Sequence, residues 1–245
     1  MFFIAHANAK IAKNNMISRK NSIFATNNEQ RSNHITEKTM NHTVSHDAMG
    51  RFQRFLKRVA DFLFALSGLV VLSPLFLIIA ALMKKQDNGP IFFKQIRIGY
   101  CGRPFVIFKF RTMSSVVEEY GPQLVATCDD SNSTKLEQFL RGHHLDELPQ
   151  LWNVLRGDMS FVGPRPERKF FIDKIMEHTN RYPIIYRMRP GLTSEATLYN
   201  GYTDTMEKML KRMEMDIHYY EHRSLWVDFK IVAKTFASII CGKKF

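Results

Sequence analysis

The feature that most constrains the fold is an unbroken apolar run at residues 62–83, which reads FLFALSGLVVLSPLFLIIAALM. A helix rises about 1.5 Å per residue, so a run of this length can cross a hydrocarbon core of about 30 Å. A buried helix in a soluble domain normally carries a polar stripe along one face, and this run has none. The sequence therefore predicts that this segment enters a membrane.

Two features bear on whether the segment crosses the membrane or turns back inside it. Ser73-Pro74 lies at its centre, where the proline removes a helical hydrogen bond and disfavours helix at the preceding residue. Both ends are basic, whereas a spanning helix usually carries its Lys and Arg on the cytoplasmic side only. These cations are Arg51, Arg54, Lys57 and Arg58 before the run and Lys84 and Lys85 after it. We favour a helix-break-helix hairpin that breaks at Ser73 and Pro74 and has both ends on the cytoplasmic face; a proline-kinked single span is the alternative.

The remainder of the chain divides around this segment. Residues 1–50 are rich in polar residues with little apolar periodicity, so we expect a disordered polar tail without a signal peptide. Residues 51–86 would form the membrane-entering re-entrant helix, and residues 87–245 a cytoplasmic domain. Three cysteines match neither a zinc-site nor a CxxC spacing, which is typical of a reducing compartment.

The charge of the chain limits its partners. A net charge of +12 suits anionic lipid, phosphorylated small molecules or nucleic acid. The sequence has no helix-turn-helix punctuation, zinc finger or RNP-type run, so we do not expect nucleic acid as a partner.

Two adjacent acids precede a short amphipathic helix that we expect near residues 148–155. Its apolar residues at helical spacing are Leu148, Leu151, Trp152 and Leu155. Pro149 is tolerated only in the first turn, so Asp146 and Glu147 must lie at or just before that turn. Free N–H groups there favour negative charge and can bind phosphate. The pair could be a nucleophile and a metal ligand, or simply two acids that suit the start of a helix.

Several cations are candidate phosphate ligands. Residues 91–98 and 105–113 are typical of a β-hairpin, in which Lys109 and Arg111 would share a face and hold a diphosphate, or form an ordinary solvated strand face. Arg141 ends a short helix immediately before the acidic pair. Arg165 lies between two prolines that would fix its backbone, and Arg189 lies in a second rigid basic turn. A plain surface turn is the alternative for Arg165.

Two later helices carry the remaining candidates. Asp216 falls on the apolar stripe of the helix that contains Met209 and Met213, where a carboxylate needs a partner. A metal ion or an arginine would serve, and a structural salt bridge is the alternative. The last helix has one apolar side, which would pack on the domain or lie in the lipid interface.

Taken together, the motifs resemble the bacterial sugar transferase family, also called the monotopic polyprenyl-phosphate phosphoglycosyltransferases. The resemblance covers residues 51–245. It rests on Lys57-Arg58 with Asp61, Ser73-Pro74, GPIFFKQ at 89–95, KFRTM at 109–113, LDELPQL at 145–151, GDMSFVGPRP at 157–166 and RPGLT at 189–193. Each motif alone is weak, but this number of motifs in this order is specific.

The family implies an α-rich α+β fold with a re-entrant membrane hairpin, a small β-hairpin and several amphipathic helices at the membrane interface. It also implies transfer of a sugar-1-phosphate from a nucleotide sugar to polyprenyl phosphate, at the cytoplasmic face of the bacterial inner membrane. Asp146 resembles the nucleophile, and Glu147 the carboxylate that holds Mg²⁺. Membrane lipids are expected partners, and a homodimer stays open.

The resemblance assigns further roles to single residues. Arg141 and Arg189 look like phosphate ligands, Arg165 is a candidate for the nucleotide side, and Asp216 matches a family acid near the metal. The sequence departs from the pattern after Thr193, where many members continue with GWAQVNG and this chain has SEATLYNG. That departure bears on sugar or nucleotide preference. The rival hypotheses are a glycosyltransferase that moves only the sugar and a basic scaffold protein without catalysis.

Overall fold

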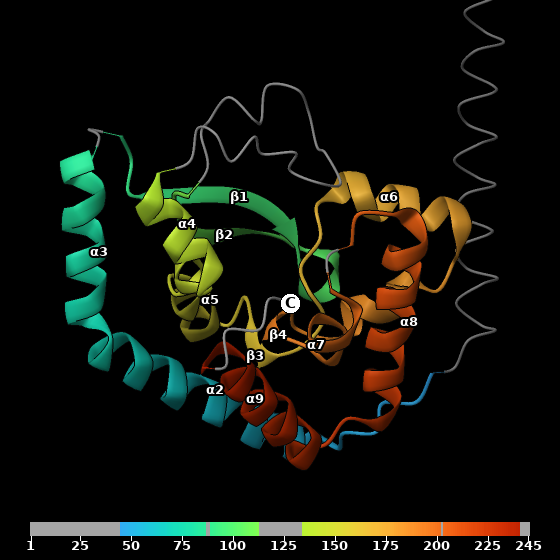
Figure 1. Ribbon diagram of the computed structural model, residues 1–245. Coiled ribbons are helices and arrows are strands. Elements are labelled where there is room, and N and C mark those ends of the chain that lie inside the picture. The colour runs from blue at the N-terminus through green and yellow to red at the C-terminus, as the bar shows by residue number, and fades with distance from the viewer. Residues whose placement is uncertain (1–44, 87–88, 113–133, 202, 241–245) are drawn as a thin grey trace, which may run out of the picture. The chain divides into compact units, whose positions relative to one another are not determined.

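The computed structural model describes residues 45–240, apart from residues 87–88, 113–133 and 202 (Figure 1). These residues form a helix-rich α+β arrangement with two small two-stranded sheets. In chain order the helices and strands are α2 (Arg51–Val71), α3 (Ser73–Gln86), β1 (Phe92–Ile98), β2 (Pro104–Phe110), α4 (Lys135–Gly142), α5 (Gln150–Arg156), β3 (Ser160–Val162), α6 (Lys169–His178), β4 (Gly191–Thr193), α7 (Glu195–Asn200), α8 (Met206–His222) and α9 (Leu225–Ile240). Three 3₁₀ turns lie at Tyr100–Gly102, Leu145–Glu147 and Tyr182–Arg187.

The apolar segment folds as two helices with a break at the predicted position. Helix α2 ends at Val71 and α3 begins at Ser73, and the two helices are bent by 56°. Pro74 is the second residue of α3, where its missing N–H costs no helical bond. Within the described part of the chain no single helix has the length and hydropathy to cross a membrane, whereas α2 and α3 together do.

Helix α2 is docked on the domain through two polar side chains. The Arg58 guanidinium donates to the carbonyl oxygens of Val154 and Leu155 at 2.7 and 2.9 Å, at the C-terminal end of α5. The buried Asp61 carboxylate accepts a hydrogen bond of 3.1 Å from the Phe161 N–H in β3. Helix α3 instead packs its Ile79 and Met83 against β2 and α4.

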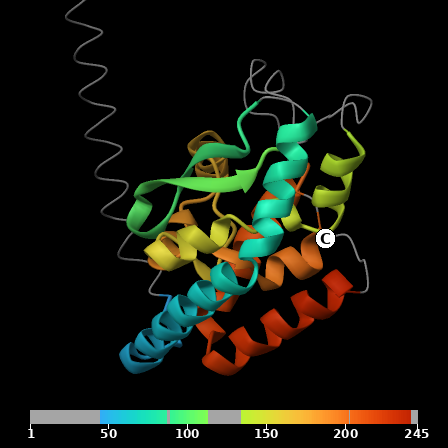
Figure 2. The ribbon, with the colours of Figure 1, turned by 90° about the vertical axis from the view of Figure 1, so that its left-hand side faces the viewer.

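Apolar side chains remain exposed along α2, α3 and α9. In Figure 1, α3 runs along the left edge of the domain and α2 and α9 along its lower edge, and in Figure 2 α2 and α3 face the viewer above α9. On α9, Trp226, Phe229 and Phe236 are at least 60% exposed, while Ile231 is buried. On α2 and α3 the most exposed are Phe52, Phe55, Phe64, Val70, Val71 and Leu77. Helix α9 thus packs on the domain by one side, as one of the two expectations had it, and its exposed apolar side leaves the expected lipid contact a prediction.

The predicted β-hairpin is present, but its second strand is shorter than predicted. Strands β1 and β2 pair antiparallel from Phe92 with Phe110 to Ile98 with Pro104. Arg111 lies one residue beyond the end of β2, but its N–H still donates to the Ile91 carbonyl at 2.9 Å, so the backbone pairing continues to this residue. The expectation that Arg111 shares a face with Lys109 stays a prediction.

A short parallel pair, β3 with β4, joins the two basic turns that the sequence suggested separately. The Gly163 N–H donates to the Thr193 oxygen at 3.1 Å, and the Gly191 N–H donates to the Pro164 oxygen at 2.9 Å. A Cβ on Gly163 would lie 2.2 Å from the backbone oxygen of Arg189, so no side chain fits there. The glycines therefore permit the backbones of the two turns to touch.

The main core lies between α6, α8 and the Tyr182–Arg187 turn. The predicted stripe of α8 is confirmed, since Met209, Met213 and Ile217 are at most 5% exposed. The described chain begins before the predicted end of the polar tail. Met49 is buried, and the Asp47 carboxylate accepts two hydrogen bonds of 2.8 and 2.7 Å from Arg223. Residues 45–50 are thus ordered rather than part of the tail, and the rest of the tail lies outside the described residues.

Candidate active site

The acidic pair lies on a 3₁₀ turn between α4 and α5. Thr134 is the N-cap of helix α4, and its hydroxyl oxygen accepts a hydrogen bond of 3.3 Å from the Glu137 N–H. The turn itself begins after His144, whose φ of 55° is left-handed, a conformation rare outside glycine and frequent at functional sites. Helix α5 then starts at Gln150, directly after Pro149. The prediction that the two acids precede the first helical turn is confirmed.

The predicted apolar stripe of α5 is confirmed except at Trp152. Leu151 is buried, and Leu148 and Leu155 are partly buried against the core. Trp152 is 48% exposed, so its assignment to the buried face is wrong. The buried face includes Asn153 instead, because this side chain packs against β2.

Asn153 fastens α5 to the open edge of β2. Its Nδ2 donates to the Val106 carbonyl at 2.7 Å, and its Oδ1 accepts from the Phe108 N–H at 3.1 Å. The side chain thus replaces a neighbouring strand and satisfies two buried backbone groups. It also sets the position of the acidic turn relative to Lys109, the next residue of β2. Sequence reasoning missed this role, and the one available signal was an Asn inside a short helix, where it has poor helix propensity.

Lys109 contacts the acidic pair directly. Its Nζ lies 2.6 Å from Glu147 Oε1, and both side chains are about one fifth exposed. Burial favours the protonated form of Glu147, but the charges of Lys109 and Arg165 outweigh that effect and lower its pKa to about 2. Glu147 is therefore ionised at every physiological pH.

Asp146 has the opposite electrostatic environment. Its side chain is buried, with 9% of the residue exposed. Burial raises the pKa of Asp146 to about 6, with Lys109 opposing the shift and the charge of Glu147 adding to it. At neutral pH this carboxylate is still ionised, yet it is more basic than an ordinary aspartate and poorly solvated. Both properties suit a nucleophile.

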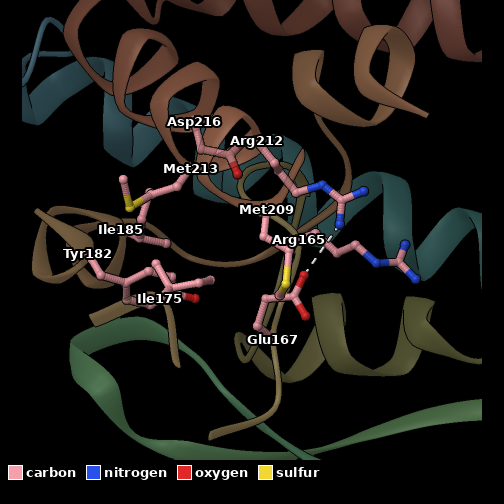
Figure 3. A pocket seen from close by; sticks show the side chains of 9 residues that line it. All are labelled: Arg165, Glu167, Ile175, Tyr182, Ile185, Met209, Arg212, Met213 and Asp216. Atoms are coloured by element: carbon pink, nitrogen blue, oxygen red, sulfur yellow. Dashed lines mark hydrogen bonds and ion pairs between the residues drawn. The ribbon is translucent and has the colours of Figure 1, made fainter. Parts of the chain in front are cut away.

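A small pocket lies beside this site and contains Arg165 and Asp216 (Figure 3). Its polar lining is completed by Glu167 and Arg212, and its apolar lining comes from the main core. The charge of Arg165 lowers the pKa of both acids of the pair and also that of Arg212. Arg165 thus lines the pocket and also lies close enough to the acidic pair for its charge to act on both carboxylates.

Asp216 is placed away from the acidic pair. It is 4% exposed, and burial raises its pKa to about 8, with Arg212 opposing and Glu167 adding to the shift. This shift favours the protonated form near neutral pH, and the expected role of Asp216 as a metal ligand stays a prediction. Its expected partner of arginine type is present in the form of Arg212.

The other predicted phosphate ligands are spread around α5. The Arg189 Nε donates to the Gly157 oxygen at 3.0 Å, at the C-terminal end of α5, whereas the acidic pair precedes its N-terminus. A helix of this length separates those ends by about 10 Å. Arg141 lies one turn before the acidic pair, on α4. The Arg111 guanidinium lies against Gly89, where a Cβ would be 1.7 Å from its Nη1.

A metal ion at the acidic pair would have few protein ligands. Among the described residues no three His, Cys, Asp or Glu side chains are grouped as a metal site. Mg²⁺ often needs only one or two protein carboxylates, because waters and substrate phosphates complete its shell. The permanently ionised, partly exposed Glu147 fits such a ligand, with Asp146 beside it.

Comparison with known proteins agrees with this arrangement. A family model described as bacterial sugar transferase matches residues 52–242. The chain is 38% identical over 188 residues to the UDP-N-acetylgalactosamine-undecaprenyl-phosphate N-acetylgalactosaminephosphotransferase of Aeromonas hydrophila, a match that covers 77% of this chain and 44% of that protein. It is 42% identical over 187 residues to the UDP-glucose:undecaprenyl-phosphate glucose-1-phosphate transferase of Caulobacter vibrioides, covering 75% and 69%.

A shorter relative shares most of its length with this chain. The uncharacterized sugar transferase EpsL of Bacillus subtilis is 34% identical over 188 residues, covering 77% of this chain and 89% of that protein. By contrast, the chain spans less than half the length of the Aeromonas protein. Since the family model matches from α2 to beyond the end of α9 and includes the acidic turn, this chain belongs to the bacterial sugar transferase family.

Proposed function

We propose that this protein transfers a sugar-1-phosphate from a nucleotide diphosphate sugar to polyprenyl (undecaprenyl) phosphate, as the initiating step of surface polysaccharide or glycoconjugate synthesis. The observation that carries the proposal is the buried Asp146 carboxylate next to the ion pair of Lys109 and Glu147. The names of relatives that use UDP-sugars and undecaprenyl phosphate support the same substrates.

The reaction proceeds in two displacements at the phosphorus that carries the sugar. In the first, an oxygen of Asp146 bonds to that phosphorus, the bond to the bridging oxygen breaks, and its electron pair leaves with the nucleoside monophosphate. In the second, an oxygen of polyprenyl phosphate attacks the same phosphorus, and the Asp146 carboxylate departs unchanged. Covalent catalysis of this kind lets a water-soluble and a lipid-soluble substrate be handled in turn.

Charge repulsion is the main barrier to an aspartate attacking a phosphate anion, and nearby cations offset it. Lys109 forms an ion pair with Glu147, and Arg165 lines the neighbouring pocket. From there Arg165 would hold the phosphate that leaves with the nucleoside. We propose that Glu147 holds Mg²⁺, which when bound supplies positive charge for the phosphate oxygens. Asp216 stays a second candidate ligand for this ion, and it lies in the neighbouring pocket.

We further propose that α2 and α3 enter the cytoplasmic membrane of a bacterium as a re-entrant hairpin. Their exposed apolar side chains, the break at Ser73, and basic residues at both ends support this location. The hairpin would hold the acidic pair at the surface where the lipid phosphate lies. The test places single cysteines at Gly50 and Gln86 in a variant without native cysteines. Labelling of both from the cytoplasmic side supports a hairpin, and labelling from opposite sides indicates a single span.

The released nucleotide tests the reaction. Purified protein is incubated with Mg²⁺, polyprenyl phosphate and a panel of UDP-sugars that includes glucose and N-acetylgalactosamine. The proposal predicts release of UMP and a lipid that carries sugar and two phosphates. Release of UDP would instead indicate a glycosyltransferase that moves only the sugar, and an Asp146→Asn variant with full activity would exclude the nucleophile.

A further inference from the structure

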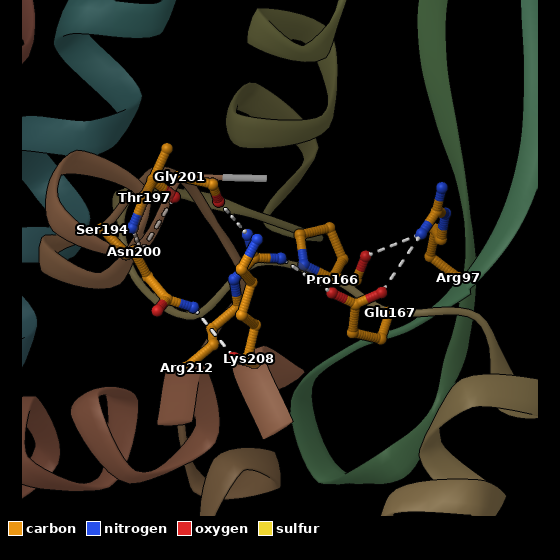
Figure 4. Close-up of polar contacts among 9 residues, drawn as sticks. All are labelled: Arg97, Pro166, Glu167, Ser194, Thr197, Asn200, Gly201, Lys208 and Arg212. Atoms are coloured by element: carbon orange, nitrogen blue, oxygen red, sulfur yellow. Dashed lines mark hydrogen bonds and ion pairs between the residues drawn. The ribbon is translucent and has the colours of Figure 1, made fainter. Parts of the chain in front are cut away.

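Glu167 is clamped between two arginines that come from opposite sides of the domain. Arg212 of α8 donates from Nη1 to Glu167 Oε1 at 3.3 Å, and Arg97 of β1 has its Nη1 3.7 Å from Glu167 Oε2 (Figure 4). All three side chains are less than one fifth exposed. Mostly buried ion pairs are much less screened by water and salt than surface pairs. The three charges therefore act on one another strongly.

The same clamp fixes the backbone that follows Arg165. Arg97 Nη1 also donates to the Pro166 carbonyl at 3.1 Å, and the Ile98 N–H donates to the Glu167 carbonyl at 3.1 Å. On the other side of Arg165, the Pro164 oxygen accepts from Gly191 at 2.9 Å. The backbone of Arg165 is thus held at both ends, by β1 and by β4.

Glu167 also affects Arg165 through its charge. Burial lowers the pKa of Arg97 to about 10 and also lowers that of Arg212; in both cases Glu167 opposes the shift and Arg165 adds to it. Arg165 and the two clamping arginines therefore repel one another, and the Glu167 carboxylate offsets that repulsion.

The second contact of Arg212 keeps its guanidinium in place. Its Nη2 donates to the Gly201 carbonyl at 3.1 Å, directly after α7. Helix α7 is itself fixed, because Ser194 caps the Thr197 N–H at 2.9 Å and Asn200 donates to the Lys208 carbonyl at 2.8 Å (Figure 4). Through Arg212, Glu167 is therefore linked by hydrogen bonds to residues 194–201, the segment in which this sequence departs from the family pattern.

We propose that Glu167 is a positioning residue for Arg165: held by Arg97 and Arg212, it keeps the Arg165 guanidinium directed at the phosphate on the nucleotide side. The inference rests on the proposed function, since it assigns Arg165 to the nucleotide sugar. Glu167 itself would touch neither substrate, and its effect would be limited to the first displacement.

The test is a double-mutant cycle on purified full-length protein, with UMP release as the readout and UDP-sugar and polyprenyl phosphate varied separately. Glu167→Gln should lower kcat/KM for the UDP-sugar by about 10- to 100-fold, the range typical of residues that support a ligand. It should leave kcat/KM for polyprenyl phosphate unchanged, because that ratio reports only the second displacement. Combined with Arg165→Gln, it should add little to the loss that Arg165→Gln causes alone, because both remove the same interaction. Glu167→Asp keeps the charge and should restore much of the activity.

The matched control is Glu214→Gln, which removes the same kind of carboxylate from an exposed ion pair between α8 and Arg181. Glu214→Gln should leave kcat/KM unchanged. The inference is overturned if Glu167→Gln behaves like that control, if the two losses multiply in the double variant, or if kcat/KM for polyprenyl phosphate falls equally. If Glu167→Gln fails to fold, Arg212→Gln is substituted in the same cycle. Release of UDP by the wild type would refute the proposed function itself, independently of the variants.

Discussion

The tether between α5 and β2 can be tested by removing the Asn153 side chain. Asn153→Ala removes a fully buried side chain and leaves its two part-buried partners, the Val106 carbonyl and the Phe108 N–H, without a hydrogen bond. An unsatisfied backbone group away from water costs about 1–3 kcal/mol, so we expect a loss of about 2–6 kcal/mol. For a chain of this size 1 kcal/mol corresponds to about 2–4 °C in melting temperature. The variant should therefore melt at least about 4 °C below the wild type.

The assay is thermal unfolding of the detergent-solubilised protein, followed by intrinsic fluorescence. Asn200→Ala is the matched control, because its side chain also donates to a backbone carbonyl, at 2.8 Å, but in an exposed position. Surface changes of this kind usually stay within about 0.5 kcal/mol. If both variants melt together, the side chain of Asn153 does not hold α5 in place, and the argument for how the acidic turn is positioned fails.

Three further perturbations follow from the structure. Gly163→Ala should disrupt the contact of β3 with β4 and abolish stable folding or activity, since its Cβ would lie 2.2 Å from a backbone oxygen, whereas Gly50→Ala meets nothing within 4 Å and should be neutral; equal melting temperatures would contradict this. Asp216 has a folded pKa of about 8, above its unfolded value, so its contribution to stability is complete below about pH 4 and is lost as pH rises toward 8. Asp216→Asn should therefore flatten the fall of melting temperature between pH 5 and 8. An unchanged slope would refute this expectation. Lys109→Met should lower kcat/KM by at least about tenfold, because it removes the ion-pair partner of Glu147. Lys94→Met on the same hairpin should leave kcat/KM unchanged. Equal rates in the two variants would count against a role for the ion pair.

Local patterns predicted those parts of the molecule that depend on local physics. The break at Ser73 follows from Pro74, and the place of Asp146 and Glu147 before α5 follows from Pro149, because proline restricts the backbone whatever surrounds it. The buried stripe of α8 likewise follows from helical spacing. The exposure of Trp152 could not be predicted, because its helix is oriented by a side chain that bonds to a strand remote in sequence.

Contacts between distant segments account for the remaining differences. Strand β3 pairs with β4 although no sequence periodicity connects them. The same is true of the clamp formed by Arg97, Glu167 and Arg212. The family resemblance makes Arg189 a candidate phosphate ligand, and only the fold shows that its Nε bonds to the Gly157 oxygen at the C-terminal end of α5. Residue chemistry thus identified candidate ligands, while their distribution around the acidic pair required the fold.

The account depends most directly on Asp146 carrying the sugar phosphate. Protein incubated with Mg²⁺ and the accepted UDP-sugar, without polyprenyl phosphate, is quenched, digested and analysed by mass spectrometry. The account predicts that the peptide containing Asp146 gains the mass of one sugar phosphate, that the adduct disappears when polyprenyl phosphate is added, and that Asp146→Asn never forms it. An unmodified Asp146 peptide under conditions in which the complete reaction turns over, or an adduct that persists in Asp146→Asn, would contradict it.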